Sequence, residues 1–173
     1  MRLHREVVLA CLWLGACANA SSDEAADEPS PTAADAAMPA LTYDLPAGWE
    51  DAVLIPGLVQ TPCGGSALGN GPKDTLRANI EGSQVAIAYD HAHFRCLQDV
   101  EAFAKRADHM LEVLVQPIDM HPRSVAKCDC LYDISMQLDV EPGALDVTLY
   151  RRWDELTHPS EPVSIGSVSL EVP

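Results

Sequence analysis

A strict alternation of apolar and polar side chains is the feature that most constrains how this 173-residue chain can fold. In residues 134–141 every second side chain is apolar, and the pattern resumes in residues 145–150 after the four residues Glu-Pro-Gly-Ala. Such alternation is typical of strands that bury one face, and Pro-Gly is typical of the turn that follows a strand. The pattern therefore predicts two strands of an all-β domain.

Other segments show the same periodicity. Residues 75–90 contain two apolar-rich runs separated by Glu-Gly-Ser, which predicts a hairpin. Two more strands are predicted at residues 100–105 and 110–116, although residues 99–107 also fit a short helix. A last strand is predicted at residues 163–172.

Seven or eight short strands at this spacing favour an antiparallel β-sandwich as the fold class. We expect its core to span residues 76–173, preceded by an extended N-terminal part of the same domain at residues 41–75. About 130 residues are enough for one domain with its own hydrophobic core. Because the chain has only two Phe and three Trp, that core must consist mostly of Val, Ile and Leu.

The N-terminus predicts export. Arg2 and Arg5 precede an apolar run at residues 7–14, which is far shorter than the roughly 20 residues needed to span a bilayer. The next residues complete Leu-Gly-Ala-Cys, which resembles the lipobox of bacterial lipoproteins and ends at Cys17. The resemblance implies that residues 1–16 are a lipoprotein signal peptide and that Cys17 carries a diacylglycerol.

Two alternatives remain at this terminus. Residues 18–20 read Ala-Asn-Ala, so an ordinary signal peptidase could cut before Ser21. A buried N-terminal helix is less favoured, because an acidic and proline-rich stretch follows without helical periodicity.

Residues 17–40 read as a lipid-anchored linker. After Cys17 the segment is mostly Ala, Ser, Asp, Glu, Pro and Thr, with five acidic residues and no basic ones. Such a segment cannot bury enough surface to offset the entropy of ordering, so we expect it to be disordered.

The charge of the chain excludes one class of partner. The formal net charge is −15, from 26 acidic and 11 basic residues. Residues 1–16 contain only Arg2, Arg5 and Glu6 as acidic or basic residues, so 25 acidic and 9 basic ones remain without them. Nucleic acid is an unfavourable partner, because binding it requires neutralisation of phosphates. As partners we expect the membrane, bound through the lipid on Cys17, and an envelope protein or other envelope ligand.

Four cysteines remain in the domain. Cys63, Cys96, Cys128 and Cys130 allow three pairings, and an exported protein meets an oxidising compartment. A bond between Cys128 and Cys130 is disfavoured, because residues i and i+2 of a strand lie too far apart. One of these two cysteines should therefore bond to Cys96 and the other to Cys63, which leaves the choice open.

Metal binding is the alternative interpretation. His91 and His93 would share one face of a regular strand, close in sequence to Cys96. Copper or zinc could use such ligands, but the spacing matches no closed zinc pattern, and disulfides would consume the thiolates. We therefore expect no cofactor, with His91 and His93 as weak metal candidates.

Catalytic motifs are not found. Residues 64–68 read Gly-Gly-Ser-Ala-Leu, which lacks the final glycine of the G-x-S-x-G pattern. No phosphate loop, H-E-x-x-H or EF-hand pattern is present in the sequence. We therefore expect a protein that is not an enzyme.

Residues 76–153 resemble a small domain of bacterial surface lipoproteins, including myxobacterial ones. The shared pattern is a hairpin, a lone cysteine, a C-x-C followed by an aromatic-Asp pair, a Pro-Gly turn and a strand ending in basic residues. This chain has Leu145 and Leu97 where the family commonly has an aromatic residue and a second cysteine. The resemblance implies an immunoglobulin-like fold without a settled activity.

These observations together predict a membrane-anchored lipoprotein of the bacterial cell envelope, at the outer membrane on its periplasmic or surface side. Its disulfide-stapled β-sandwich would have a structural or binding role. The alternative function is an extracytoplasmic copper- or zinc-binding protein that uses His91 and His93.

Overall fold

The computed structural model describes residues 42–65, 72–124, 126–156 and 161–173, which form two β-sheets and no helix. The expected signal peptide, Cys17 and the linker lie outside the described residues.

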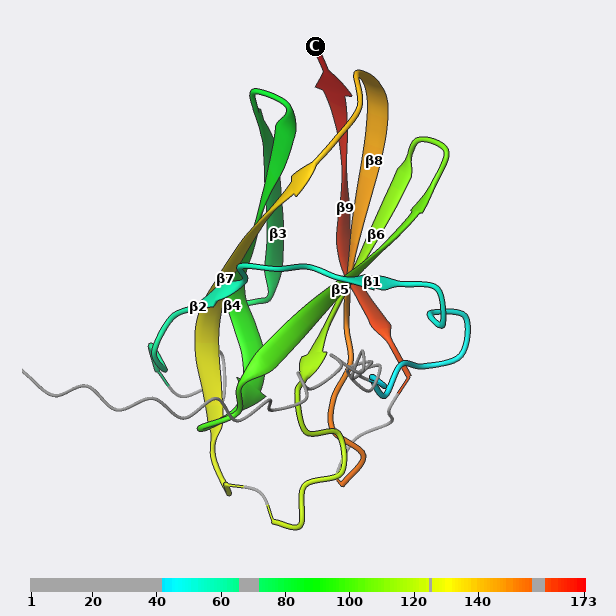
Figure 1. The fold of residues 1–173 in the computed structure, drawn as a ribbon. Coiled ribbons are helices and arrows are strands. Elements are labelled where there is room, and N and C mark those ends of the chain that lie inside the picture. The colour runs from blue at the N-terminus through cyan, green and yellow to red at the C-terminus, as the bar shows by residue number, and fades with distance from the viewer. Residues whose placement is uncertain (1–41, 66–71, 125, 157–160) are drawn as a thin grey trace, which may run out of the picture. The chain divides into compact units, whose positions relative to one another are not determined.

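The two sheets, which we call sheet A and sheet B, are shown in Figure 1. In spatial order, sheet A contains β1 (Val53–Leu54), β5 (Val100–Ala107), β6 (Met110–Pro117), β8 (Gly143–Arg151) and β9 (Val163–Val172). Sheet B contains β2 (Val59–Gln60), β7 (Asp129–Asp139), β4 (Gln84–Arg95) and β3 (Thr75–Glu81). All neighbouring strands are antiparallel except β6 and β8, which are parallel.

This arrangement confirms the prediction of an all-β sandwich. The seven longer strands, β3 to β9, match the expected number, and β1 and β2 add two strands of two residues each. Residues 100–107 form a strand, so the helix alternative for this segment is wrong. The parallel pair departs from a purely antiparallel sandwich, because the chain leaves sheet A after β6, forms β7 in sheet B and returns to sheet A as β8.

The two hairpins with two-residue turns, β3–β4 and β5–β6, turn through left-handed residues. Gly82, between β3 and β4, has a φ of 66°, and Asp108, between β5 and β6, has a φ of 51°. Two-residue hairpin turns favour positive φ, which Gly adopts freely and Asp tolerates. The first of these hairpins is the one that the sequence predicts.

The main core lies between the sheets and is built from alternate residues of the long strands. Val, Ile and Leu predominate, as predicted, and Tyr89 and Phe94 contribute aromatic rings that pack edge to face at 6.5 Å. The fully buried members of this core with the largest side chains are Tyr89, Phe94, Ile87, Leu111, Ile134, Leu149, Val85, Val113 and Val115.

The outer face of sheet A is covered as well. Phe103 and Leu114 point away from the main core, yet neither is exposed to solvent. Residues N-terminal to β1 provide the cover: Tyr43 packs edge to face on Phe103 at 5.0 Å, and Trp49 packs on Tyr150 at 5.6 Å. This explains why β6 is buried on both faces rather than alternating.

Residues 42–65 form a continuous segment that we call the N-terminal strap. It lies on the outer face of sheet A, pairs with β5 through β1, and then crosses to sheet B, where β2 pairs with β7. One segment therefore joins the same edge of both sheets (Figure 1).

Candidate functional site

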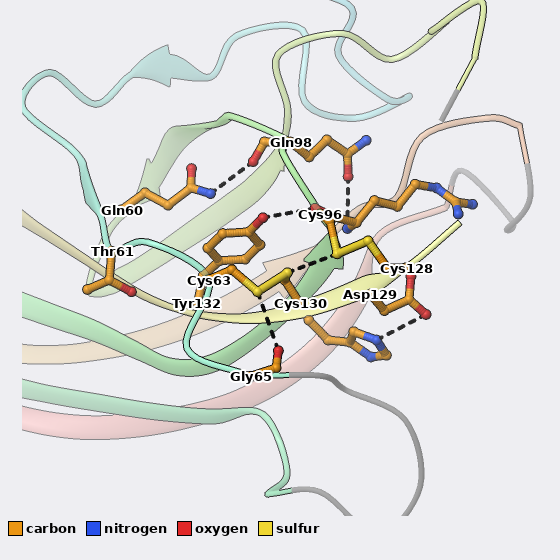
Figure 2. The surroundings of a disulfide bond; sticks show 12 residues. Gln60, Thr61, Cys63, Gly65, Cys96, Gln98, Cys128, Asp129, Cys130 and Tyr132 are labelled. Atoms are coloured by element: carbon orange, nitrogen blue, oxygen red, sulfur yellow. Dashed lines mark hydrogen bonds and ion pairs between the residues drawn. A yellow bond between two sulfur atoms is a disulfide. The ribbon is translucent and has the colours of Figure 1, made fainter. Parts of the chain in front are cut away.

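Four cysteines meet at one end of sheet B (Figure 2). Cys63, in the strap after β2, is bonded to Cys130 on β7. Cys96, directly after β4, is bonded to Cys128, directly before β7. The Sγ atoms of Cys130 and Cys96 lie 3.0 Å apart, so the two disulfides are in contact. Cys130 is buried, whereas Cys63 and Cys128 are exposed.

Backbone hydrogen bonds position this sulfur cluster on both edges of β7. The Cys96 N–H donates to the Cys128 carbonyl at 3.0 Å, which extends the ladder between β4 and β7 by one pair. On the opposite edge, the Gly64 N–H donates to the Leu131 carbonyl at 2.9 Å, and the Leu131 N–H donates to the Gly65 carbonyl at 3.1 Å. The strap residues beside Cys63 therefore continue the sheet.

The disulfide pairing decides the choice that the sequence left open. Cys130 is bonded to Cys63, 67 residues away in the sequence, and Cys128 is bonded to Cys96, 32 residues away. Cys130 is inside strand β7, where its side chain points toward the core. Cys128 precedes the strand and lies opposite Cys96, with which it shares the hydrogen bond described above.

A β-bulge shapes the histidine segment of β4. Tyr89 and Ala92 are both in register with β7, but Asp90 and His91 together lie opposite the single residue Asp133. His91 has a φ of 56°, and its N–H donates to the Asp133 carboxylate at 3.0 Å. The extra residue moves the buried positions from odd numbers before the bulge to even numbers after it.

His93 is in contact with groups of the fold. Its Nε2 lies 3.5 Å from a carboxylate oxygen of Asp129, and its ring packs edge to face on Trp153 at 5.2 Å. The regular strand geometry behind the expected pairing of His91 with His93 is interrupted by the bulge. Within the described residues, neither histidine belongs to a cluster of three or more metal-ligating side chains.

Two such clusters do occur in the described part of the chain, namely Cys63, Cys96 and Cys130, and Asp44, His121 and Glu155. The sulfur atoms of the first cluster are in disulfides and offer no thiolate. In the second, exposed cluster, His121 Nε2 lies 2.6 Å from Asp44 and Nδ1 lies 3.1 Å from Glu155. Both imidazole nitrogens are thus already paired with carboxylates.

A buried ion pair adjoins the sulfur cluster. The Arg95 Nε donates to a carboxylate oxygen of Asp154 at 3.0 Å, and Asp154 is fully buried. Burial by itself raises the pKa of the Asp154 carboxyl, but hydrogen bonds from Gln98, Arg95 and the Leu156 N–H, together with the charge of Arg95, outweigh burial and lower this pKa overall. The carboxyl is therefore held in its charged form at this end of the sandwich.

A groove of about 910 Å³ runs between the strap and sheet B. The strap supplies an apolar wall in which Val53 and Val59 are 69% and 60% exposed. Sheet B supplies small outward-facing side chains, which include Ala86, Ala88 and Ser135. Exposed valines beside small side chains leave room for an apolar group of a ligand.

Amides and carboxylates form the polar part of this groove. Glu81 accepts hydrogen bonds from the Asn79 amide at 3.0 Å and from the Gln137 amide at 3.1 Å. Asp139 accepts one from the Gln84 amide at 2.9 Å. The groove thus combines an apolar wall with side chains that can both donate and accept hydrogen bonds.

Sequence reasoning missed the groove, the His121 cluster and the Arg95–Asp154 ion pair. Each unites residues that are far apart in the chain: 59 positions separate Arg95 from Asp154. A single sequence carries no signal for such pairs. The bulge is visible in the sequence. Asp90 and His91 are two consecutive polar residues, whereas strict alternation allows only one polar residue between apolar ones.

Comparisons with known proteins do not assign a family, since no family model, no curated protein and no solved structure matches this chain.

Within the described residues, no helix has the length and apolarity that a membrane crossing requires.

Proposed function

We propose that this chain is a lipid-anchored protein of the bacterial cell envelope whose β-sandwich has a structural or binding role and no catalytic one. The observation that carries the proposal is the pair of disulfides within an all-β domain. Disulfides persist in oxidising compartments outside the cytoplasm, and the apolar, cysteine-terminated N-terminus supplies an export signal for the same chain.

The anchor in this proposal is Cys17, modified after removal of residues 1–16. Residues 17–40 then connect the membrane to the strap, which begins at residue 42. At about 3.4 Å per residue this linker reaches at most roughly 80 Å, and as a flexible coil it averages about 25–30 Å. We place the protein at the outer membrane, with the domain on its periplasmic or surface side.

Two acyl chains are sufficient for such an anchor. One myristoyl chain gives only reversible membrane binding, whereas two lipid anchors together hold a protein stably, at about 0.8 kcal/mol for each buried CH₂. The domain itself is acidic and is repelled by anionic lipid, so it would extend away from the bilayer.

The groove between the strap and sheet B is the surface where we place binding. Its apolar wall and its amide and carboxylate groups suit a ligand with both apolar and hydrogen-bonding groups, as a segment of another envelope protein has. The acidic charge of the chain disfavours nucleic acid as this partner.

Fatty-acid labelling tests the anchor. Bacteria that express the full chain are grown with an alkyne-tagged palmitate, and the purified protein is assayed for the tag. We expect labelling of the wild type and of the matched control Cys11→Ala, and loss of labelling together with loss of membrane association in Cys17→Ala. An unlabelled wild type, or one that starts at Ser21, contradicts the proposal.

A further inference from the structure

The two disulfides of the sulfur cluster form a contiguous array of four sulfurs. The order is Cys63, Cys130, Cys96 and Cys128, with covalent bonds between the outer pairs and a 3.0 Å contact between the inner Sγ atoms. The Sγ atoms of Cys63, Cys96 and Cys130 all lie within 4.8 Å of one another. A bond between Cys96 and Cys130 could therefore replace the bond between Cys63 and Cys130 with little movement.

The solvent exposure of the array differs between its ends and its centre. Cys63 and Cys128, the outer members, are exposed, whereas Cys130 is only 2% exposed. An external thiol therefore reaches the Cys128 sulfur more readily than the Cys130 sulfur. Exposed disulfides are the ones that exchange most easily, because exchange requires direct attack on a sulfur atom.

Cys96 keeps its place when its own disulfide is broken. Its N–H donates to the Cys128 carbonyl at 3.0 Å, directly after the last strand pair of β4 with β7. Phe94 of β4, two residues before Cys96, is in register with Cys130 and is fully buried. The Cys96 sulfur thus remains beside the Cys130 sulfur without help from the Cys96–Cys128 bond.

A recess beside Cys96 offers access from the other side. Its volume is about 400 Å³, and Cys96, Leu97 and Ile118 are among its lining residues. Leu97 is 95% exposed and Ile118 is 60% exposed, so the recess has an apolar rim. Protein dithiols that attack a disulfide must first dock on the surface around it, and an apolar rim provides such a surface.

We propose that the sulfur cluster is a thiol–disulfide exchange site, in which reduction of Cys96–Cys128 by a dithiol transfers the Cys130 bond from Cys63 to Cys96. One thiolate of the dithiol attacks Cys128 and releases the Cys96 thiolate. The second thiol of the dithiol then displaces Cys128 as a thiol, so the dithiol becomes a disulfide and two electrons enter the protein. The Cys96 thiolate attacks the Cys130 sulfur, the Cys96–Cys130 bond forms, and Cys63 leaves as a thiolate that takes a proton from water.

The exchange removes the covalent link between the strap and β7. Cys63–Cys130 is the covalent link between the strap and sheet B, whereas the new Cys96–Cys130 bond joins β4 to β7, which are already paired. The product has two exposed thiols, on Cys63 and Cys128. This inference concerns the chemistry of the four cysteines and does not depend on the proposed anchor.

Partial reduction of the folded full-length protein tests this proposal. The protein is treated briefly with dithiothreitol at neutral pH, quenched with acid, alkylated and mapped by peptide mass spectrometry. Among molecules with one disulfide left, we expect labels on Cys63 and Cys128 and a Cys96–Cys130 bond. Labels on Cys96 and Cys128 with Cys63–Cys130 intact would overturn the proposal, as would direct reduction of Cys63–Cys130 before the other disulfide.

A matched pair of variants isolates the role of the Cys96 sulfur. In Cys128→Ser, where Cys96 is a free thiol from the start, we expect the Cys96–Cys130 bond and a labelled Cys63 without any added dithiol. In Cys96→Ser, we expect Cys63 to remain unlabelled after the same dithiothreitol treatment and alkylation that label Cys63 in the wild type. Equal labelling of Cys63 in the wild type and in Cys96→Ser contradicts the exchange.

Discussion

The two ends of the N-terminal strap are attached in different ways. At sheet A, the strap is held by side chains: Trp49 packs on Tyr150, and the buried Arg152 donates to the Asp44 carbonyl at 2.6 Å. At sheet B, it is held by the Cys63–Cys130 disulfide. A short β-ladder is present at both ends, β1 with β5 at sheet A and β2 with β7 at sheet B.

The difference follows from the outer faces of the two sheets. Sheet A presents large side chains such as Phe103 and Leu114, which the strap buries completely. Sheet B presents Ala86, Ala88 and Ser135, which offer little apolar area to bury. Since apolar burial contributes about 25 cal/mol per Å², the strap gains little by packing on sheet B, and a covalent bond holds it there.

Removing the disulfide that holds the strap should have the largest effect. We expect Cys63→Ala with Cys130→Ala to lower the free energy of unfolding by about 4 kcal/mol, because the bond closes a long loop of the unfolded chain. Amide hydrogen exchange should rise at residues 59–65 and remain slow at residues 53–55.

The matched control is Cys96→Ala with Cys128→Ala. It removes a disulfide of similar entropic value, about 4 kcal/mol, but leaves Cys63–Cys130 in place. Here exchange at residues 59–65 should stay slow. Equal acceleration in both double variants contradicts the assignment of the strap to one disulfide.

Truncating the aromatic anchor at sheet A should have the next largest effect. Trp49 is 5% exposed, and we expect Trp49→Ala to cost about 3 kcal/mol, measured by urea unfolding. Exchange should then rise at the sheet A end of the strap and stay slow beside Cys63. Val53→Ala, at an exposed position, should change stability by less than about 0.5 kcal/mol. A cost of Trp49→Ala as small as that control is inconsistent with the packing described.

Neutralising Asp154 should give a smaller, pH-dependent loss. Its pKa in the folded protein is lowered, so its contribution to stability is present above its unfolded pKa and is lost as pH falls through the folded value. We expect Asp154→Asn to cost about 2 kcal/mol at pH 7. The difference from the wild type should shrink below about pH 4 in a series of unfolding curves. A difference that stays constant down to pH 2 contradicts the charged state of the buried carboxyl.

The Lys105 contacts should contribute least. Its Nζ lies 2.8 Å from Glu112, and 4.8 Å from the centre of the Trp49 ring. The lysine also lowers the pKa of the Glu112 carboxyl by hydrogen bonding. Because the pair is partly exposed, we expect Lys105→Met to cost about 0.5 kcal/mol at low salt and less at 1 M salt. Lys73→Met, at an exposed position, is the control; equal losses in both variants argue against a specific contact.

Local periodicity was sufficient to predict most of the strands. The alternation in residues 134–150 and the turn around Gly82 depend on nearest neighbours along the chain, and both are found in the structure. Strand geometry also excluded a bond between Cys128 and Cys130. Strand geometry alone could not assign the partners of Cys128 and Cys130, because these depend on the register of β4 against β7 and on where the strap ends.

Features made by distant segments were not predictable. Regular alternation places Leu114 on the face of β6 opposite Leu111 and Val113, but the strap covers that face, so both faces are buried. The groove requires the strap to cross from sheet A to sheet B, and no single segment encodes that path. The expected His91–His93 pair assumed a regular strand, and the bulge at residues 90–91 removes that regularity.

One measurement tests the account of a strap stapled to sheet B most directly: a non-reducing peptide map of the full-length protein purified from membranes, with its thiols alkylated beforehand. The account predicts two disulfide-linked peptides, Cys63 with Cys130 and Cys96 with Cys128, and no alkylated cysteine among these four. A map with Cys63 bonded to Cys96 or Cys128, or with Cys63 alkylated, contradicts it.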